Sequence, residues 1–308
     1  MRLSFCSLTA VCLLSITLVS CSRKSANGVE VDSALKGYIL PKSKVLAGVD
    51  LNNLKQTEFY RRHQSQLEIP QLNRFAEQIG IDPRRDLSSF LLSWDGTDVL
   101  AMTRGTFDPS KLEKRLSANM QQEKYNKLTL FGDGKQDVVF LPMGIALAGP
   151  APKIKGVIAD KATGSGGVSE DLQIQLARLN QGSQAWLISS GVIPLAQLSV
   201  GSNAASMLSN IADYINATAV GIKMDAGVSL DAHISCISEE GAQRVHDALR
   251  GVIGLARLST KDNQLEQLKI WDSIHVDQQG KEVHITVELT PELADKLITA
   301  LPSVTNRF

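Results

Sequence analysis

The chain has no excess of charge of either sign, since 32 Lys and Arg residues balance 32 Asp and Glu residues. Without an overall field to attract nucleic acid or an anionic surface, we expect no nucleic-acid partner. Aromatic residues are scarce, at 5% of the chain, which argues against a surface on which carbohydrate rings stack. With 43% apolar and 21% charged residues, the composition is that of a folded globular protein.

Motifs of familiar enzyme chemistry are also missing. There is no Gly-x-Ser-x-Gly and no His-Glu-x-x-His. Ser33 and Lys36 match the Ser-x-x-Lys spacing of penicillin-recognising enzymes, but the Ser-Asp-Asn and Lys-Thr-Gly partners are absent. Gly164-Ser165-Gly166-Gly167 lacks the flanks of a P-loop, and Asp82-Pro83-Arg84-Arg85-Asp86 is typical of a polar turn, with an anion contact as the alternative. We therefore expect a protein that is not an enzyme and needs no cofactor.

One apolar run, at residues 8–19, follows the cationic Arg2 at the start of the chain. At about twelve residues it is too short to cross a bilayer, which takes about twenty. A cationic start, an apolar core and small residues after it are the parts of an export signal. The run ends in Leu18-Val19-Ser20-Cys21.

This ending resembles the lipobox of bacterial lipoproteins, in which the Cys thiol receives a diacylglycerol before the signal is cut off. The resemblance implies removal of residues 1–20 and a mature chain that starts at a lipidated Cys21. Two or three acyl chains anchor firmly where one would not. Ser22 after the Cys, in place of Asp, implies the periplasmic face of the outer membrane if the host has two membranes. An ordinary secretory signal with a chance Cys is the alternative.

Cysteine usage agrees with the signal. Of four cysteines, Cys6 and Cys12 lie in the removed segment and Cys21 carries lipid, which leaves Cys236 alone. No intramolecular disulfide is then available, and metal sites of the Cys-x-x-Cys type are excluded. Cys236 ends an alternating apolar run, which predicts a buried, inert thiol.

An internal repeat organises the rest of the chain. Residues 35–51 and 176–191 each contain a spaced Leu pair, a polar turn and a short apolar strand, about 140 residues apart. In each half the expected later elements are a helix, a hairpin, a helix, a hairpin and a helix. In the first half they are a helix at 72–79, a hairpin of 90–94 with 99–103, a helix opened by Asp108, a hairpin of 128–131 with 138–141 and a helix behind Pro150. In the second half they are a helix at 207–215, a hairpin of 219–224 with 228–237, a helix opened by Ser238, a hairpin of 268–276 with 283–289 and a helix behind Pro291.

This order predicts an α+β fold with two tandem copies of a strand-helix-hairpin-helix-hairpin-helix unit, a mainly antiparallel sheet and helices on one face. The expected parts are a signal (1–20), a tether (21–31), a first repeat (32–161), a linker (162–168) and a second repeat (169–308). The sequence leaves open whether the copies form one sheet or two. The pattern resembles exported bacterial lipoproteins of duplicated α+β type, a resemblance that brings no activity with it.

The strongest candidate site is a histidine-bearing sheet face. His275 and His284 occupy the polar positions of the last predicted hairpin, and with Gln279-Gly280 as its turn they lie directly opposite each other, with Cβ atoms about 5 Å apart. His233 and Asp231 occupy the polar face of an earlier predicted strand. If that strand neighbours the hairpin, three imidazoles, or two with a carboxylate, could hold zinc. The alternative is a solvated sheet face on which histidine has no special role.

Three function classes follow from this reading. The first is a membrane-anchored envelope lipoprotein that binds another envelope protein as an adaptor, which calls for an exposed apolar patch. The second is a carrier of an apolar ligand between the two halves, which calls for a closed apolar pocket of several hundred Å³. The third is a metal-dependent enzyme at the histidine face, which calls for titratable groups in a cleft. The adaptor is the reading that we prefer.

Overall fold

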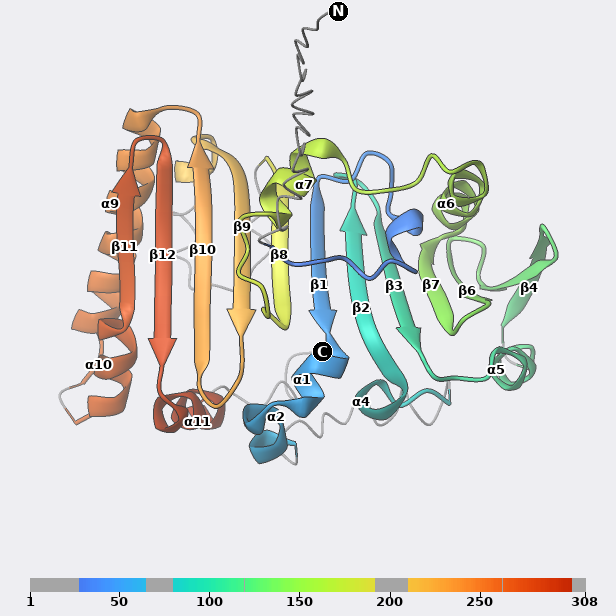
Figure 1. Cartoon of the computed structure of the whole chain (residues 1–308), viewed down its shortest axis with the longest axis horizontal. Helices are drawn as coiled ribbons and strands as arrows, with labels where there is room; N and C mark the ends of the chain where they lie inside the picture. The colour runs from blue at the N-terminus through green and yellow to red at the C-terminus, as the bar shows by residue number, and fades with distance from the viewer. Residues whose placement is uncertain (1–27, 65–79, 119, 192–209, 262, 301–308) are drawn as a thin grey trace, which may run out of the picture.

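A computed structural model describes residues 28–64, 80–118, 120–191, 210–261 and 263–300. Its centre is a single twelve-stranded antiparallel sheet in the order β11-β12-β10-β9-β8-β1-β2-β3-β7-β6-β5-β4 (Figure 1). The α+β class with a mainly antiparallel sheet is therefore confirmed, and both halves of the chain share one sheet. Cys21 and the expected helix at 72–79 lie outside the described residues, as do the first three residues of the helix expected at 207–215.

The first half of the chain forms the strands β1 to β7. Asp108 opens α5 as expected, because its carboxylate accepts hydrogen bonds from the backbone N–H groups of Ser110 and Lys111. The elements of this half are η1 (Lys36–Tyr38), β1 (Val45–Asp50), α1 (Leu51–Gln56), α2 (Glu58–His63), α4 (Pro83–Asp86), β2 (Leu87–Trp94), β3 (Val99–Gly105), α5 (Pro109–Leu116), β4 (Gln121–Tyr125), β5 (Leu128–Gly132), β6 (Gln136–Leu141), β7 (Ile145–Pro150) and α6 (Ala151–Thr163).

The second half forms the remaining strands. Its elements are α7 (Glu170–Leu176), β8 (Ala185–Ser190), β9 (Ile215–Lys223), β10 (Val228–Cys236), α9 (Glu239–Leu258), α10 (Leu265–Asp272), β11 (Ile274–Gln279), β12 (Glu282–Leu289) and α11 (Pro291–Ala300). The strand expected at 268–276 is wrong in its first part, because residues 265–272 are helical. Leu265, Leu268 and Trp271 recur every three residues, which is a helical spacing.

β1 and β8 join the two halves at the middle of the sheet. They pair antiparallel, and Gly48 on β1 lies opposite Trp186 on β8. A Cβ added at Gly48 would come within 2.4 Å of the indole ring, so only a glycine leaves room for it. The indole, whose residue is 7% exposed, then packs across the seam between the halves.

A row of directly paired residues defines the two faces of the sheet. Successive partners from β5 to β11 are Leu130, Val139, Leu147, Met102, Leu91, Gly48, Trp186, Gly221, Asp231, Thr286 and His275. Directly opposite residues point to the same side of an antiparallel sheet. All of these side chains therefore belong to one face, which we call the α6 face; the other is the α9 face.

Helices cover both faces, which corrects the expectation that they lie on one. Ile154 of α6 packs on the α6 face, together with α7, whereas Leu112 of α5 and Val245 of α9 pack on the α9 face. The reason is visible at Leu130 and Phe131, which are consecutive, point to opposite faces and are both buried. A strand that is apolar on both sides needs cover on both sides. Among the described helices, none is both long enough and apolar enough to cross a membrane.

The N-terminal segment packs against the α6 face. Val29 and Val31 contact the core of this face. The Asp32 carboxylate accepts a 2.8 Å hydrogen bond from the Ser89 hydroxyl and pairs with the Arg104 guanidinium at 3.2 Å. Residues 28–31, expected in the tether, thus belong to the folded body, because their apolar side chains have a core to join.

The expected linker at 162–168 is likewise part of the fold. α6 runs to Thr163 and ends at Gly164, whose φ of 75° is left-handed. A Cβ added at Gly166 would lie 2.2 Å from the Gly37 carbonyl oxygen, and Val168 is buried. The segment is a packed connection that leads from α6 to α7.

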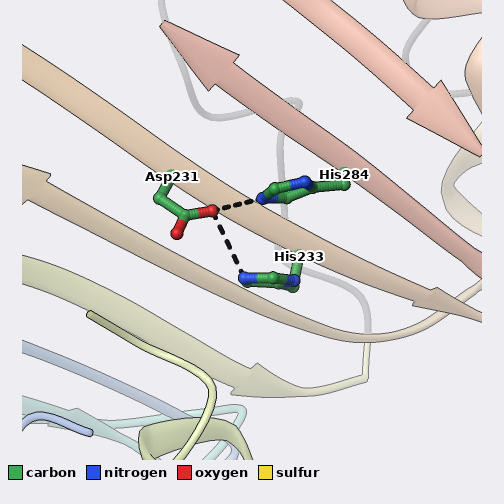
Figure 2. Close-up of side chains that lie close together, drawn as sticks. All are labelled: Asp231, His233 and His284. Atoms are coloured by element: carbon green, nitrogen blue, oxygen red, sulfur yellow. Dashed lines mark hydrogen bonds and ion pairs between the residues drawn. The ribbon is translucent and has the colours of Figure 1, made fainter.

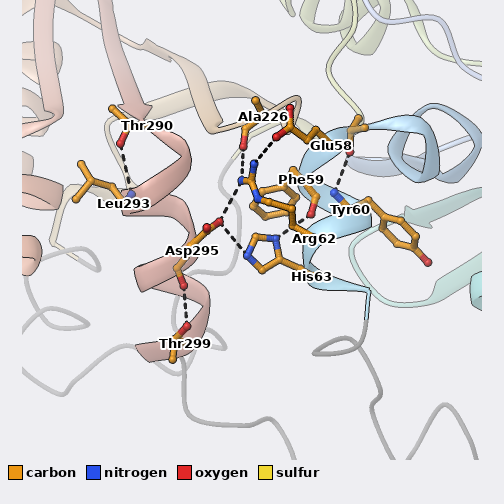
Figure 3. Close-up of polar contacts among 11 residues, drawn as sticks. Glu58, Phe59, Tyr60, Arg62, His63, Ala226, Thr290, Leu293, Asp295 and Thr299 are labelled. Atoms are coloured by element: carbon orange, nitrogen blue, oxygen red, sulfur yellow. Dashed lines mark hydrogen bonds and ion pairs between the residues drawn. The ribbon is translucent and has the colours of Figure 1, made fainter.

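A polar cluster fastens α2 to α11 (Figure 3). His63 is buried, with Nδ1 2.8 Å from the Phe59 carbonyl oxygen and Nε2 3.1 Å from Asp295 Oδ1. Arg62 donates to the Ala226 carbonyl at 2.6 Å and to Asp295 at 3.1 Å. Both His63 ring nitrogens thus lie within hydrogen-bond distance of an oxygen atom. The cluster ties the first half of the chain to the end of the second.

Candidate functional site

Three polar side chains meet on the α6 face of β10 and β12 (Figure 2). His233 and His284 are direct partners in the pairing of these strands, and Asp231 lies two residues before His233. The zinc hypothesis required β10 to neighbour the last hairpin, and it does. The alternate residues of the same strands, such as Ile234 and Val283, are buried under α9. The apolar residues thus fix which side of the sheet the polar ones face.

Asp231 holds the two imidazoles together. Its Oδ1 lies 3.2 Å from His233 Nε2 and 2.5 Å from His284 Nε2. The two rings stack with their centroids 4.4 Å apart and their planes inclined by 18°. All three potential ligand atoms lie within 4.8 Å of one another. The side chains remain partly open to solvent, with exposed fractions of 22% for Asp231, 29% for His233 and 40% for His284.

The loop after α7 reaches over this cluster. Asn180 Nδ2 donates a 2.5 Å hydrogen bond to Asp231 Oδ2, the oxygen that the histidines do not use. Arg178 forms a two-pronged pair with Glu282 at 2.7 and 3.2 Å and also donates to the Ser235 hydroxyl. The site therefore has one carboxylate oriented by an amide and, beside it, a cation whose charge is balanced by a second carboxylate.

The electrostatics of the cluster act on His233. Partial burial lowers the pKa of His233 below its ordinary value of 6.5, and the positive charges of His284 and Arg178 act in the same direction. The carboxylates of Asp231 and Glu282 oppose this shift without cancelling it. The neutral imidazole, which has a lone pair to offer, is thus the favoured form of His233 at neutral pH.

His275 does not join the cluster, which corrects the expected pairing with His284. β11 ends at Gln279, which pairs with Glu282, so the turn is Gly280-Lys281 and not Gln279-Gly280. This shifts the register by two residues and places His275 opposite Thr286. The shift keeps His275 on the same face but moves it away from His284, where it is exposed and its Nδ1 lies 3.1 Å from the Ser273 carbonyl oxygen.

The sequence pattern missed the residues that surround the cluster. Asn180 and Arg178 lie in a loop about 50 residues before β10, and nothing in their local sequence indicates where they reach. The nearest signal was the repeat itself, because it places a polar turn before β8 as it does before β1. Glu282 carried a weak signal, since it shares the alternating polar positions of β12 with His284.

The other candidate residues lead away from catalysis. Cys236 is buried at 5% exposure, as predicted, and burial raises the pKa of its thiol, which favours the unreactive protonated form. In the turn at α4, the carboxylates of Asp82 and Asp86 pair with Arg84 and Arg85, so these guanidinium groups have partners within the turn itself. The turn thus gives no support to an anion contact.

Comparison with known proteins adds a fold and no activity. No protein-family model matches the chain, and no curated protein matches it. Solved structures that match include crystal forms of TP0453. Crystal form III aligns with a TM-score of 0.51 and 10% identity over 88% of this chain and 99% of that chain. Crystal form I aligns with a TM-score of 0.47 and 11% identity over 88% and 98%. At such low identity, the likeness shows the α+β fold alone.

Proposed function

We propose that the protein is an envelope lipoprotein whose folded body is held at a membrane by acyl chains on Cys21. The Leu18-Val19-Ser20-Cys21 ending of the apolar run carries this proposal. The packed body supports it by its spacing, because residues from Gly28 onward already contact the core. Seven Cα–Cα steps separate Cys21 from Gly28, which is about 25 Å at full extension. A lipid on Cys21 would keep the body close to the bilayer, at the periplasmic face of the outer membrane in a host with two membranes.

Replacement of the lipidated residue tests the anchor. We expect Cys21→Ala to move the protein from the membrane fraction to the soluble fraction, and the native N-terminal peptide to carry the mass of attached acyl chains. Cys236→Ala is the matched control, because that thiol is buried in the body and should leave fractionation unchanged. A Cys21→Ala protein that stays with the membrane, or an unmodified Cys21 in the native protein, contradicts the proposal.

Within the envelope, we propose that the protein acts by binding another protein and not as an enzyme. The observation that supports this role is a group of exposed leucines where α9 meets α10: Leu255, Leu258 and Leu265 are 53%, 85% and 62% exposed. A group of solvent-exposed leucines marks an interaction surface more often than a single exposed leucine does. We call these three residues the leucine tip.

Site-specific crosslinking tests the leucine tip. A photo-crosslinking residue at Leu258 should capture a protein of the cell envelope in intact cells. The same residue at Glu240, exposed at the other end of α9, serves as the matched control and should capture much less. Capture of lipid alone at Leu258, or equal capture of protein at both positions, argues against a protein partner at this surface.

The carrier alternative gains less support. A hollow of about 280 Å³ lies beside β1, β2 and the N-terminal segment. Its lining includes the charged side chains of Asp32, Asp50 and Arg104 as well as apolar ones. An apolar ligand would have to remove Asp50 and the Asp32–Arg104 ion pair from water and would offer them no polar contact in return, which is unfavourable. We therefore keep the adaptor as the proposed function.

We also infer that the body consists of two copies of one unit. The strand order β1-β2-β3-β7-β6 on one side of the seam matches β8-β9-β10-β12-β11 on the other, and β1 and β8 begin 140 positions apart, at Val45 and Ala185. The main difference is that the first copy inserts β4 and β5 where the second has α10. An experimental structure in which residues 32–161 and 169–300 fail to superpose would contradict this inference.

A further inference from the structure

The cluster of Asp231, His233 and His284 is built on strands and not on loops. His233 and His284 face each other across one antiparallel pair, and Asp231 shares their face because side chains alternate along β10. The strands are pinned from the other side by buried residues such as Val245 of α9, which is fully buried. Sites on paired strands hold their geometry better than sites on loops.

The spacing of the donor atoms is close to that of a metal site. In a tetrahedral site with metal–ligand bonds of about 2.0–2.1 Å, neighbouring ligand atoms are about 3.3 Å apart. His233 Nε2 and Asp231 Oδ1 are already 3.2 Å apart. His284 Nε2 and Asp231 Oδ1 are 2.5 Å apart. A metal ion bound by all three groups requires this pair to open by about 0.8 Å, to the ligand spacing of a tetrahedral site.

The surroundings of the cluster favour a cation. Asn180 donates to Asp231 Oδ2, which leaves Oδ1 for another partner and fixes the plane of the carboxylate. A hydrogen bond of this kind, to the ligand and not to the metal, orients the ligand groups of many metal sites. Arg178 is a cation that acts on His233, and it forms a two-pronged pair with Glu282. Its charge is therefore largely balanced and opposes a bound cation only weakly.

We propose that Asp231, His233 and His284 bind one divalent transition-metal ion of the zinc class, with at least one coordination position open to solvent. Two imidazoles and one carboxylate suit zinc, cobalt or nickel, whereas magnesium and calcium prefer oxygen ligands throughout. Three protein ligands leave a fourth position for water or for a group of a ligand, as in zinc sites that are not purely structural. The partial exposure of all three side chains lets solvent reach that position.

Direct metal titration tests the proposal. The untagged full-length chain, freed of metal with a chelator and held in detergent, is titrated with Co²⁺ and followed by visible absorption. It should bind one Co²⁺ per chain with the strong d–d bands of a four-coordinate site, and Zn²⁺ should abolish these bands by displacement. Binding below half an ion per chain, or a spectrum no different from that of Co²⁺ in buffer, overturns the proposal.

Variants separate this site from adventitious binding by surface histidine. Asp231→Asn and His284→Gln should each lose the absorption bands, whereas His275→Gln, which removes an exposed histidine from the same face, should keep them. Asn180→Ala should weaken Co²⁺ binding by about 10- to 100-fold, because it removes the group that orients the carboxylate. Binding that survives His284→Gln or is lost with His275→Gln refutes the assignment. Far-UV circular dichroism shows whether each variant is folded. If a variant in β10 or β12 fails to fold, the Co²⁺ affinity of Asn180→Ala, which changes neither strand, tests the proposal in its place.

Discussion

The pair between Asp95 and Lys153 offers the sharpest test of the fold. Asp95 lies in the turn between β2 and β3, and its Oδ2 is 2.5 Å from the ammonium of Lys153 in the first turn of α6. Its Oδ1 accepts hydrogen bonds from the backbone N–H groups of Thr97 and Asp98 at 2.9 and 2.8 Å. The pair thus fixes α6, which covers the α6 face of the first half, to the hairpin below it.

The contribution of Asp95 to stability can be worked out from its pKa. Burial alone would raise this pKa, but the hydrogen bonds from the backbone N–H of Asp98, from Lys153 and from the N–H of Thr97 outweigh it and lower the pKa from 3.8 to about 2. This lowering of the pKa corresponds to about 2 kcal/mol of stability. Because the pKa is lower in the folded state than in the unfolded chain, this stability is present above about pH 4 and is lost as the pH falls toward 2.

Urea unfolding across a pH series checks this reasoning. At pH 7, we expect Asp95→Asn to lower the free energy of unfolding by about 1–2 kcal/mol, since the asparagine keeps part of the turn's hydrogen bonding but loses the ion pair. The difference from the native protein should shrink as the pH falls below 4. Asp213→Asn, which alters an exposed carboxylate before β9, should change the free energy by less than about 0.5 kcal/mol at every pH. A difference for Asp95→Asn that is the same at pH 3 and pH 7 would refute the argument.

Three further substitutions test the seam between β1 and β8 and the polar cluster that joins α2 to α11. Gly48→Ala should destabilise the protein by about 1–3 kcal/mol in urea unfolding, because the new Cβ meets the Trp186 ring. Gly156→Ala is the control, because a Cβ added at this position in α6 has no atom within 4 Å. It should stabilise the protein by about 0.5–1 kcal/mol. If both substitutions change the stability in the same direction, the packing argument is contradicted. Asp295→Ala removes a hydrogen-bond partner of the buried His63 and should lower the free energy of unfolding by about 1 kcal/mol. An unchanged thermal midpoint would show that the polar cluster between α2 and α11 does not contribute to stability.

The elements that sequence predicted well are those whose pattern is local. The hairpins β2–β3 and β9–β10 alternate polar and apolar residues around clear turns, such as Asp95-Gly96, and both are confirmed. The helices behind Pro150 and Pro291 are also confirmed as α6 and α11. In these cases the periodicity and the turn residue point to the same answer.

The elements that sequence reasoning missed depend on tertiary contacts. β4 (Gln121–Tyr125) is polar and mostly exposed, so it forms because β5 is there to pair with it and not because of its own pattern. β7 (Ile145–Pro150) is hidden in the sequence because its apolar residues lead directly into Pro150, which signals the start of the next helix. The helix α10 was predicted as a strand because its eight residues are too few for the helical period to stand out against a short apolar run.

The part of the candidate site that depends on local pattern could be predicted from the sequence, and the part that depends on tertiary contacts could not. Alternation along β10 and β12 placed Asp231, His233 and His284 on polar faces, and that part did not require knowledge of the fold. The pairing of His233 with His284 depends on which strands are neighbours, and the exclusion of His275 depends on a hairpin turn that begins one residue later than expected. Asn180 reaches the site from another element, and no local pattern carries such a contact.

The closing helices explain why the site is open in one half of the sheet. The helix α6 follows β7 and packs on the α6 face, where it covers Met102 and Leu147. The helix α11, which takes the same place after β12, packs instead against Val287 and Leu289, on the α9 face. Under the proposed duplication, the second copy therefore keeps its strands, but its closing helix does not lie over β10 and β12 on the α6 face. On that face β10 and β12 carry Asp231 and His284, polar residues that remain partly exposed, in place of apolar ones. The N-terminal segment that leads back to Cys21 lies on this same face, with Gly28 against the end of α7 (Figure 1). The proposed lipid on Cys21 would therefore be attached seven residues before a segment that packs on the same face as the histidines.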